Sequence, residues 1–174
     1  MRPAGLQIAS NDPDESPFSI LLSATSVPLA YSNWAAANGL NGTSNGPNQD
    51  PDGDGLTNLQ EFAYGLNPGI NSSGALVLTG GSLTTRGTPI PRVEAQTFGV
   101  NYQAAYCRNS DAVAAGYTYT VQFSGDLITW FNSTATPTVQ ATDGNVQAVT
   151  VPYPFLLPNR QKARFFRVTV TPPP

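Results

Sequence analysis

Glycine and proline interrupt this chain so often that long helices have no room to form. There are 16 of each among 174 residues, and they lie with Ser, Thr and Asn between short apolar runs. This spacing is typical of short strands joined by many turns. Because 40% of the residues are hydrophobic, with many aromatic and β-branched side chains among them, the sequence predicts a folded, mainly β protein and not a disordered one.

The C-terminal part of the chain, residues 73–174, predicts an antiparallel β-sandwich. Tyr117, Tyr119, Val121 and Phe123 alternate with polar residues, as in a strand with one buried face. The other signals in this part are a turn at 124–126 leading into a strand at 127–131, a hairpin at Asp143-Gly144 between the runs 139–141 and 146–151, and a last strand with Phe166, Val168 and Val170 on one face. Seven to nine short strands are expected between residues 75 and 171.

Residues 1–27 are predicted to form a partial β element of two strands. The apolar runs 6–10 and 18–25 flank a polar turn at Asn11-Asp12-Pro13-Asp14. A lone hairpin is only marginally stable and leaves its edges unpaired. We therefore expect this element to pair with something else.

Residues 28–72 carry the only clear helical signals and predict a helix–loop–helix module. A short helix with Tyr31 and Trp34 should follow Pro28 and end at Asn38-Gly39. A second helix is indicated by apolar residues at i, i+3, i+4 and i+7: Leu59, Phe62, Ala63 and Leu66. Trp34 and Phe62 are the expected packing partners. Between the two helices, 41–49 is expected to be a flexible run.

A loop rich in carboxylates precedes the second helix, from Asp50 to Glu61. Three aspartates alternate, a glycine follows at the sixth position where the chain must bend sharply, and a glutamate stands at the twelfth. Hard cations such as Ca²⁺ take six to eight oxygen ligands. The expected ligands are the side chains of the acids and the amide, with one backbone carbonyl at the seventh position: Asp50, Asp52, Asp54, Leu56, Asn58 and Glu61.

This loop resembles the EF-hand-like calcium loops of dockerins and thrombospondin type 3 repeats, in which Asp-x-Asp-Gly-Asp-Gly is followed by Asn and an acid. The resemblance implies one bound Ca²⁺ that stabilises the fold as a clip. Mg²⁺ is less suitable because it gives up its water reluctantly. The alternative is a solvated acidic turn, which leaves unexplained why four of the 11 acids lie within this loop. The run at 41–49, which separates the first helix from the loop, departs from an ordinary EF-hand.

Two further resemblances concern the flanking parts. The segment 10–18 resembles the end of Hydin-like immunoglobulin-type repeats of large bacterial surface proteins. The segment 119–130, followed by 164–168, resembles C-terminal β modules of bacterial secreted proteins. Together they imply an extracellular or cell-surface protein. No apolar run is long enough to cross a bilayer, and no signal peptide is recognisable.

Several kinds of chemistry are not expected. The chain has no histidine and one cysteine, Cys107, which is predicted to be a buried small hydrophobe. Histidine-based catalysis and Cys-rich zinc sites are therefore excluded, and we expect no enzyme. The net charge is −3, so nucleic acid is not an expected partner. The basic residues near the end are interpreted as the solvated face of a strand: Arg160, Lys162, Arg164 and Arg167.

The sequence thus predicts a calcium-binding structural module with a role in scaffolding or adhesion. One alternative is a subunit of an extracellular filament, in which the orphan hairpin pairs with a neighbouring copy or another surface protein through exposed strands. A second alternative is a carbohydrate-binding module. Its expected glycan platform consists of aromatic side chains of the C-terminal part: Tyr106, Trp130, Phe131 and Tyr153.

Overall fold

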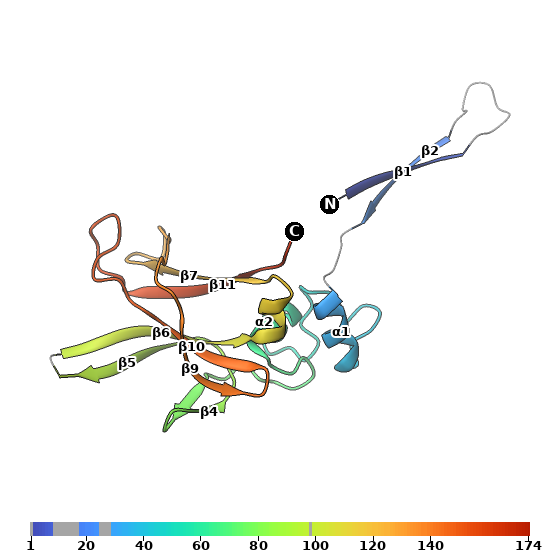
Figure 1. Cartoon of the computed structure of the whole chain (residues 1–174). Coiled ribbons are helices and arrows are strands. Elements are labelled where there is room, and N and C mark those ends of the chain that lie inside the picture. Colours follow the sequence, from blue (N-terminus) through green and yellow to red (C-terminus); the bar gives the residue numbers. More distant parts are fainter. Residues whose placement is uncertain (1, 9–17, 25–28, 98) are drawn as a thin grey trace.

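The protein is mainly β, with antiparallel sheets and few helices (Figure 1). The computed structural model describes residues 2–8, 18–24, 29–97 and 99–174. Nine strands, β3 to β11, lie within the described part of 75–171, as the spacing of turns predicts. Among the described helices, none is both long and apolar enough to cross a membrane.

Two antiparallel sheets form the body of the molecule. The larger has the strand order β5-β6-β10-β9 and the smaller the order β11-β7-β8. The larger sheet consists of β5 (Ile90–Gln96), β6 (Gly99–Asn109), β10 (Val146–Pro152) and β9 (Thr138–Asp143). The smaller consists of β11 (Phe165–Thr171), β7 (Thr118–Ser124) and β8 (Phe131–Asn132), and β3 (Val77–Thr79) pairs with β4 (Ser82–Thr85) as a short hairpin.

The two sheets share one apolar cluster. Ala104 and Tyr106 of β6 and Val149 of β10 pack with Val121 and Phe123 of β7. The predicted inward face of β7 is thus confirmed at Val121 and Phe123, and Phe166 and Val168 of β11 pack against the same cluster. Tyr106 is fully buried. The proposal that it forms part of a glycan platform is wrong, because its ring faces the core.

Two turns differ from their predicted form. In the β9–β10 hairpin Asp143 still pairs with Val146, so the two loop residues are Gly144 and Asn145 and not Asp143-Gly144. Gly144 has φ +59°, which glycine accepts without strain. The expected strand at 127–131 is reduced to β8, because the Asp126 carboxylate accepts the backbone N–H groups of residues 128 and 129 and holds a bend.

Helices cover one end of this body. They are α1 (Leu29–Ala37), α2 (Asn58–Tyr64) and the short α3 (Ser110–Ala114). Tyr31 of α1, Phe62 of α2 and Tyr117 share an apolar cluster. The predicted contact between Trp34 and Phe62 is confirmed, with ring centroids 5.5 Å apart.

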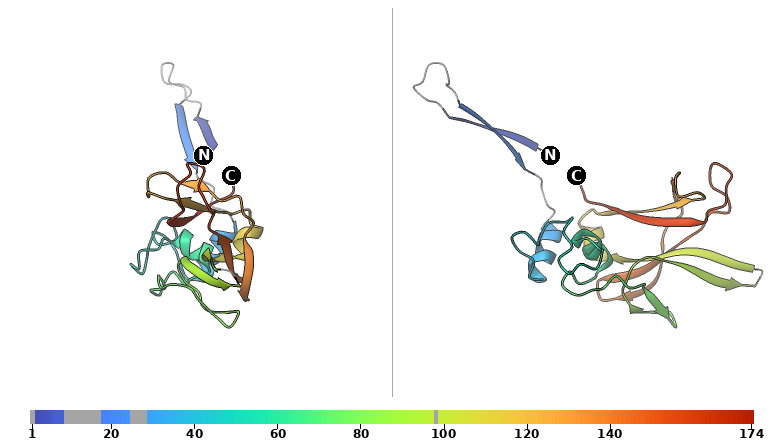
Figure 2. Two further views of the ribbon diagram at one scale, coloured as in Figure 1. Left: turned by 90° about the vertical axis from the view of Figure 1, so that its left-hand side faces the viewer. Right: turned by 180° about the vertical axis from the view of Figure 1, so that it is seen from behind.

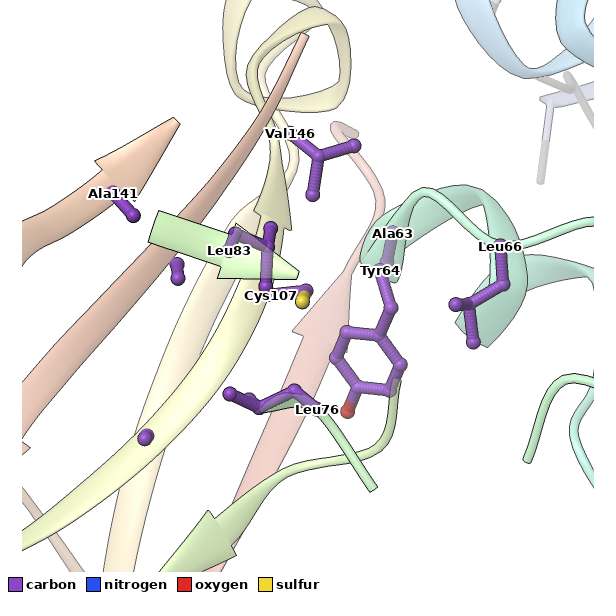
Figure 3. Close-up of a cluster of buried hydrophobic side chains, with 10 residues drawn as sticks. Ala63, Tyr64, Leu66, Leu76, Leu83, Cys107, Ala141 and Val146 are labelled. Carbon is purple, nitrogen blue, oxygen red and sulfur yellow. The ribbon is translucent and has the colours of Figure 1, made fainter. Parts of the chain in front are cut away.

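Helix α2 also packs directly on the larger sheet. Its residues Ala63 and Tyr64 meet Leu76, Cys107 and Val146 in a third cluster (Figure 3). Cys107 is a free, fully buried thiol, as predicted, and burial raises its pKa. The helical segment therefore has no core separate from that of the strands, and the boundary at 72/73 stays a prediction.

The N-terminal strands β1 (Arg2–Ile8) and β2 (Phe18–Ala24) form an antiparallel pair of their own, with Arg2 opposite Ala24 and Ile8 opposite Phe18. Within the described residues this pair is hydrogen-bonded to no other strand. It extends away from the body in all three views (Figures 1 and 2). The predicted turn at 11–14 lies outside the described residues.

The basic residues near the end of the chain differ from their interpretation as one strand face. Arg160, Lys162 and Arg164 precede β11 and lie in the loop after β10. Only Arg167 belongs to the strand, where its guanidinium lies 4.3 Å from the ring centroid of Trp130. Arg160 has φ +65° and donates its N–H to the carbonyl of Leu157, so this part of the chain forms a turn and not a continuation of the strand.

Candidate metal centre

Asp50 shapes the acidic loop by accepting backbone hydrogen bonds. Its Oδ1 accepts the N–H groups of Gly53 and Asp54 at 2.9 and 3.2 Å, and its Oδ2 accepts that of Gly55 at 3.0 Å. Gly53 and Gly55 have φ of +73° and +90°, which other residues adopt only with strain. The loop therefore curls around the first aspartate, and its alternate side chains turn to the same side.

Three carboxylates converge as a result. Each of Asp50, Asp52 and Asp54 offers an oxygen, and these oxygens all lie within 4.8 Å of one another. Asp54 is fixed on both sides, since its Oδ1 accepts the N–H of Leu56 at 2.8 Å and its Oδ2 that of Ser72 at 2.7 Å. This acidic triad can hold a metal ion.

Glu61, on α2, is not one of the three acids whose oxygens lie within 4.8 Å of one another, but it is near enough for all three to raise its pKa. The helix begins with a capping box, in which the Thr57 hydroxyl accepts the N–H of Gln60 while the Gln60 side chain accepts the N–H of Thr57 at 2.8 Å. This cap fixes the first turn, which carries Glu61. The carboxylate is fully buried, and neither of its oxygens has a hydrogen-bond partner among the described residues.

The electrostatics of the site follow from this crowding. The pKa of Glu61 is raised to about 7, first by burial and then by the negative charges of Asp52, Asp54 and Asp50, in that order of strength. The pKa of Asp52 is also raised, first by loss of hydration and then by its acidic neighbours, although the backbone N–H of Asp54 opposes the shift. Its Oδ2 is buried without a partner. The charges that act on Glu61 and Asp52 are all negative, so the site lacks a cation among the described residues to balance them.

The other two predicted ligands lie where the loop enters α2. The side chain of Leu56 packs against the cluster that contains Ala63 and Tyr64 of α2, and the role of its carbonyl as a metal ligand stays a prediction. Asn58 is fully buried and donates its amide to the carbonyls of Ser44 and Gly46 at 2.8 and 2.9 Å. Its Oδ1 has no hydrogen-bond partner among the described residues. This oxygen can therefore serve as a metal ligand while the amide nitrogen holds the 41–49 run.

The expected flexible run 41–49 is folded into turns that are fixed to α2. The N–H of Asn58 donates to Gln49 and that of Leu59 to Pro47, at 2.8 and 3.0 Å. The Tyr31 hydroxyl donates to the carbonyl of Asn45. These bonds join α1, the run and the start of α2 into one unit, although the run is rich in Gly and Asn and carries no periodic signal.

Sequence reasoning missed Ser72. Its N–H holds Asp54, and its hydroxyl oxygen is buried without a hydrogen bond of good geometry while lying near enough to Glu61 to lower that pKa slightly. Ser72 stands 18 positions after Asp54, and no local pattern connects the two. Their contact exists because α2 returns the chain to the loop.

Comparisons with known proteins add no relative: no family model, no curated protein and no solved structure matches this chain. The fold and the acidic site therefore define the protein only as a mainly β protein with a candidate metal centre at the entry to a helix.

Proposed function

We propose that this chain is a calcium-binding structural module of a secreted or cell-surface protein, in which one Ca²⁺ stabilises the fold as a clip. Its role is scaffolding or adhesion and not catalysis. The location follows from the resemblances of the loop and its flanks to bacterial surface and secreted proteins. The chain also has no histidine to act as a general base.

The observation that carries this proposal is the buried Glu61 carboxylate beside three other acids. A buried charge without a partner is costly. Here neither oxygen of Glu61 has a hydrogen-bond partner among the described residues, and the same holds for one oxygen of Asp52. A cation held by the three aspartates reduces this repulsion, and it supplies the missing partner for Asp52 and for Glu61 when the Glu61 carboxylate completes the shell.

Calcium suits these ligands better than magnesium does. The available donors are carboxylate, amide and carbonyl oxygens on a loop that bends at two glycines. Ca²⁺ accepts such a crowded set in irregular geometry, whereas Mg²⁺ demands a near-ideal octahedron and usually keeps several waters. The absence of histidine and the burial of the only cysteine leave no nitrogen or sulfur ligand for zinc.

The site stands at a junction, which explains how an ion there acts as a clip. On one side Asn58 holds the 41–49 run, and through it α1. On the other, Asp54 holds Ser72 at the start of the strand region. For an assumed Kd of ~10 μM and ~1 mM free calcium, binding stabilises the folded state by about 2.7 kcal/mol.

A thermal melt with and without calcium tests this proposal. Millimolar Ca²⁺ should raise the melting temperature above that in chelator, and Mg²⁺ should raise it less. The variant Asp52→Ala with Glu61→Ala should lose the response. Asp126→Asn is the matched control, since Asp126 forms an exposed turn outside the loop and an amide oxygen can still accept its hydrogen bonds. Identical melts in calcium and chelator refute the proposal.

A second candidate function, a filament subunit, is favoured by the N-terminal hairpin. Within the described residues β1 and β2 pair only with each other, and both are seven residues long, as is the edge strand β11. A hairpin from one copy could extend the sheet of the next. Mass measurement in calcium decides: filaments or large oligomers support assembly, and a monomer at high concentration eliminates it.

A further inference from the structure

The β5–β6 hairpin extends past the end of the smaller sheet and leaves part of its inner face uncovered (Figures 1 and 2). Ala104 and Tyr106 of β6 are buried between the sheets. Two and four positions before Ala104, the same face continues as Tyr102 and Val100, each 54% exposed. Val93 on β5 lies opposite Tyr102 and is exposed as well. The apolar alternation of β6 thus continues beyond the buried core and forms an exposed apolar surface at the end of the hairpin.

A groove lies between this surface and the loop that joins β10 to β11. Its volume is about 700 Å³, within the range of sites for small ligands or short polymer segments. Tyr102 and Tyr153 line it with their rings at 61° and their centroids 6.4 Å apart. Phe155, which is 88% exposed, is a third lining ring. A contiguous exposed apolar patch on a protein surface marks a site of interaction.

Two cations line the same groove. Lys162 and Arg164 are exposed there, and neither forms an ion pair with a described residue. By contrast, Arg86 is paired with Asp143 on the surface. In a chain of net charge −3, two free cations beside three aromatic rings indicate an occupant that is both anionic and partly apolar.

We propose that this groove binds an acidic polysaccharide whose repeating unit contains a uronic acid. The C–H face of a pyranose ring stacks on Tyr and Phe rings, and its carboxylate pairs with Lys162 and Arg164, the latter through two parallel hydrogen bonds. The site requires no metal and is independent of the calcium loop.

Two other occupants fit the groove less well. A second copy bound through the same groove would bring Lys162 and Arg164 against their own counterparts, and like charges repel. A peptide that added a strand to the free edge of β5 would meet Pro91, which lines the groove and has no N–H to donate. A polysaccharide needs neither symmetry nor a free strand edge.

The test is titration of the full chain, in buffered millimolar calcium, with hexasaccharides. Fragments of polygalacturonate, alginate and hyaluronan are compared with neutral cellohexaose and chitohexaose. At least one uronate should bind about tenfold or more tightly than the neutral sugars. Tyr102→Ala and Phe155→Ala should each weaken binding by about tenfold. Both side chains are exposed, so both variants should fold.

A charge-matched pair of variants separates this site from general attraction to anions. Lys162→Gln with Arg164→Gln should abolish uronate binding, whereas Arg160→Gln with Arg167→Gln, which removes the same charge outside the groove lining, should preserve it. Equal losses in the two pairs overturn the proposal. Binding of neutral sugars with equal affinity, or an absence of binding across the panel, also overturns it.

Discussion

Glu61 is the residue whose charge most clearly requires a bound cation in the calcium proposal. Its carboxylate is fully buried without a hydrogen bond from any described residue, and its nearest charges are also negative. Without a cation this side chain opposes folding, and with one it joins the shell that stabilises the fold. The same residue should therefore change the sign of its contribution when calcium binds.

Replacement of Glu61 by glutamine tests that change of sign. Glu61→Gln should raise the melting temperature in chelator, because a neutral amide removes the buried charge. The variant should also lose most of the stabilisation that calcium gives, because glutamine supplies one neutral oxygen in place of two charged ones. Paired melts measure both effects, with Asp126→Asn as the control. A variant that is less stable than the parent in chelator would contradict this account of the site.

The pH dependence of the calcium-free protein follows from the same carboxyl. The pKa of Glu61 is raised to about 7 from its ordinary value of 4.5, so the folded state binds a proton more tightly than the unfolded state does. Its stabilising effect is complete below about pH 4.5 and is lost as the pH rises through about 7. The free energy of unfolding should fall by up to roughly 3 kcal/mol over that window. Asp52, whose pKa is also raised, acts in the same direction.

Denaturant titrations of dialysed, calcium-free protein between pH 4.5 and 8 measure this fall. Glu61→Gln should flatten most of it, and calcium at pH 7.5 should restore the lost stability. A stability that increases across this range in the calcium-free parent would show that Glu61 already has a partner.

The residues of this site that sequence could predict are those placed by local geometry. Alternation of Asp50, Asp52 and Asp54 and a glycine at the bend are sufficient to bring three carboxylates together, and the structure confirms that they meet. Ser72 and the amide contacts of Asn58 depend on how α2 and the 41–49 run fold back. Such contacts are tertiary, and a single sequence contains no period that reveals them.

At the scale of elements, α2 links the acidic loop to the sheets. Its last turn ends at Gly65, whose left-handed backbone closes the helix. The carbonyls of Phe62 and Ala63 are not left to water. They accept hydrogen bonds from the amide of Asn109 at 3.0 Å and the hydroxyl of Tyr119 at 2.7 Å. The orientation of the helix, and of the Glu61 that it carries, is therefore set by two side chains of the strand region.

Tyr119→Phe tests that anchor. The ring remains in the core, but the carbonyl of Ala63 loses its donor in a place where water has little access, so the variant should lose about 1–2 kcal/mol of stability. Chemical denaturation measures the loss. Tyr102→Phe removes a hydroxyl from a half-exposed ring and should change stability by less than about 0.5 kcal/mol. Equal effects of the two substitutions would mean that the hydrogen bond to α2 contributes nothing.

Elements with a clear period were predicted, and those formed by capping chemistry were not. The apolar spacing in α2 and the alternation in β7 are long enough to read. Helix α3 has five residues and begins because the Asn109 side chain accepts the N–H of Asp111, a signal that any turn can share. The strand expected at 127–131 is likewise replaced by local side-chain hydrogen bonds. The Asp126 carboxylate accepts the N–H groups of residues 128 and 129, which competes with strand pairing.

At the scale of the whole molecule, the three apolar clusters are connected. Tyr119 packs against all of them, and α2 contributes Phe62 to one and Ala63 and Tyr64 to another. The helical segment and the two sheets therefore bury much of their surface against each other, and neither should unfold alone. An ion bound at the acidic loop should stabilise strands far from it.

The two tryptophans allow the stabilisation by calcium to be measured separately in the helical segment and in the sheets. Trp34 lies on α1 against Phe62, and Trp130 lies beside β8 under Arg167. Trp130→Phe leaves Trp34 as the fluorescent reporter of the helical segment, and Trp34→Phe leaves Trp130 as that of the sheets. In each variant, fluorescence and far-ultraviolet circular dichroism should give one coincident transition. Calcium should raise it by the same amount whichever tryptophan reports, because the shared clusters transmit the stabilisation. If calcium moves only the transition seen by Trp34, the helical segment is an independent domain, and the ion stabilises that domain without supporting the sheets.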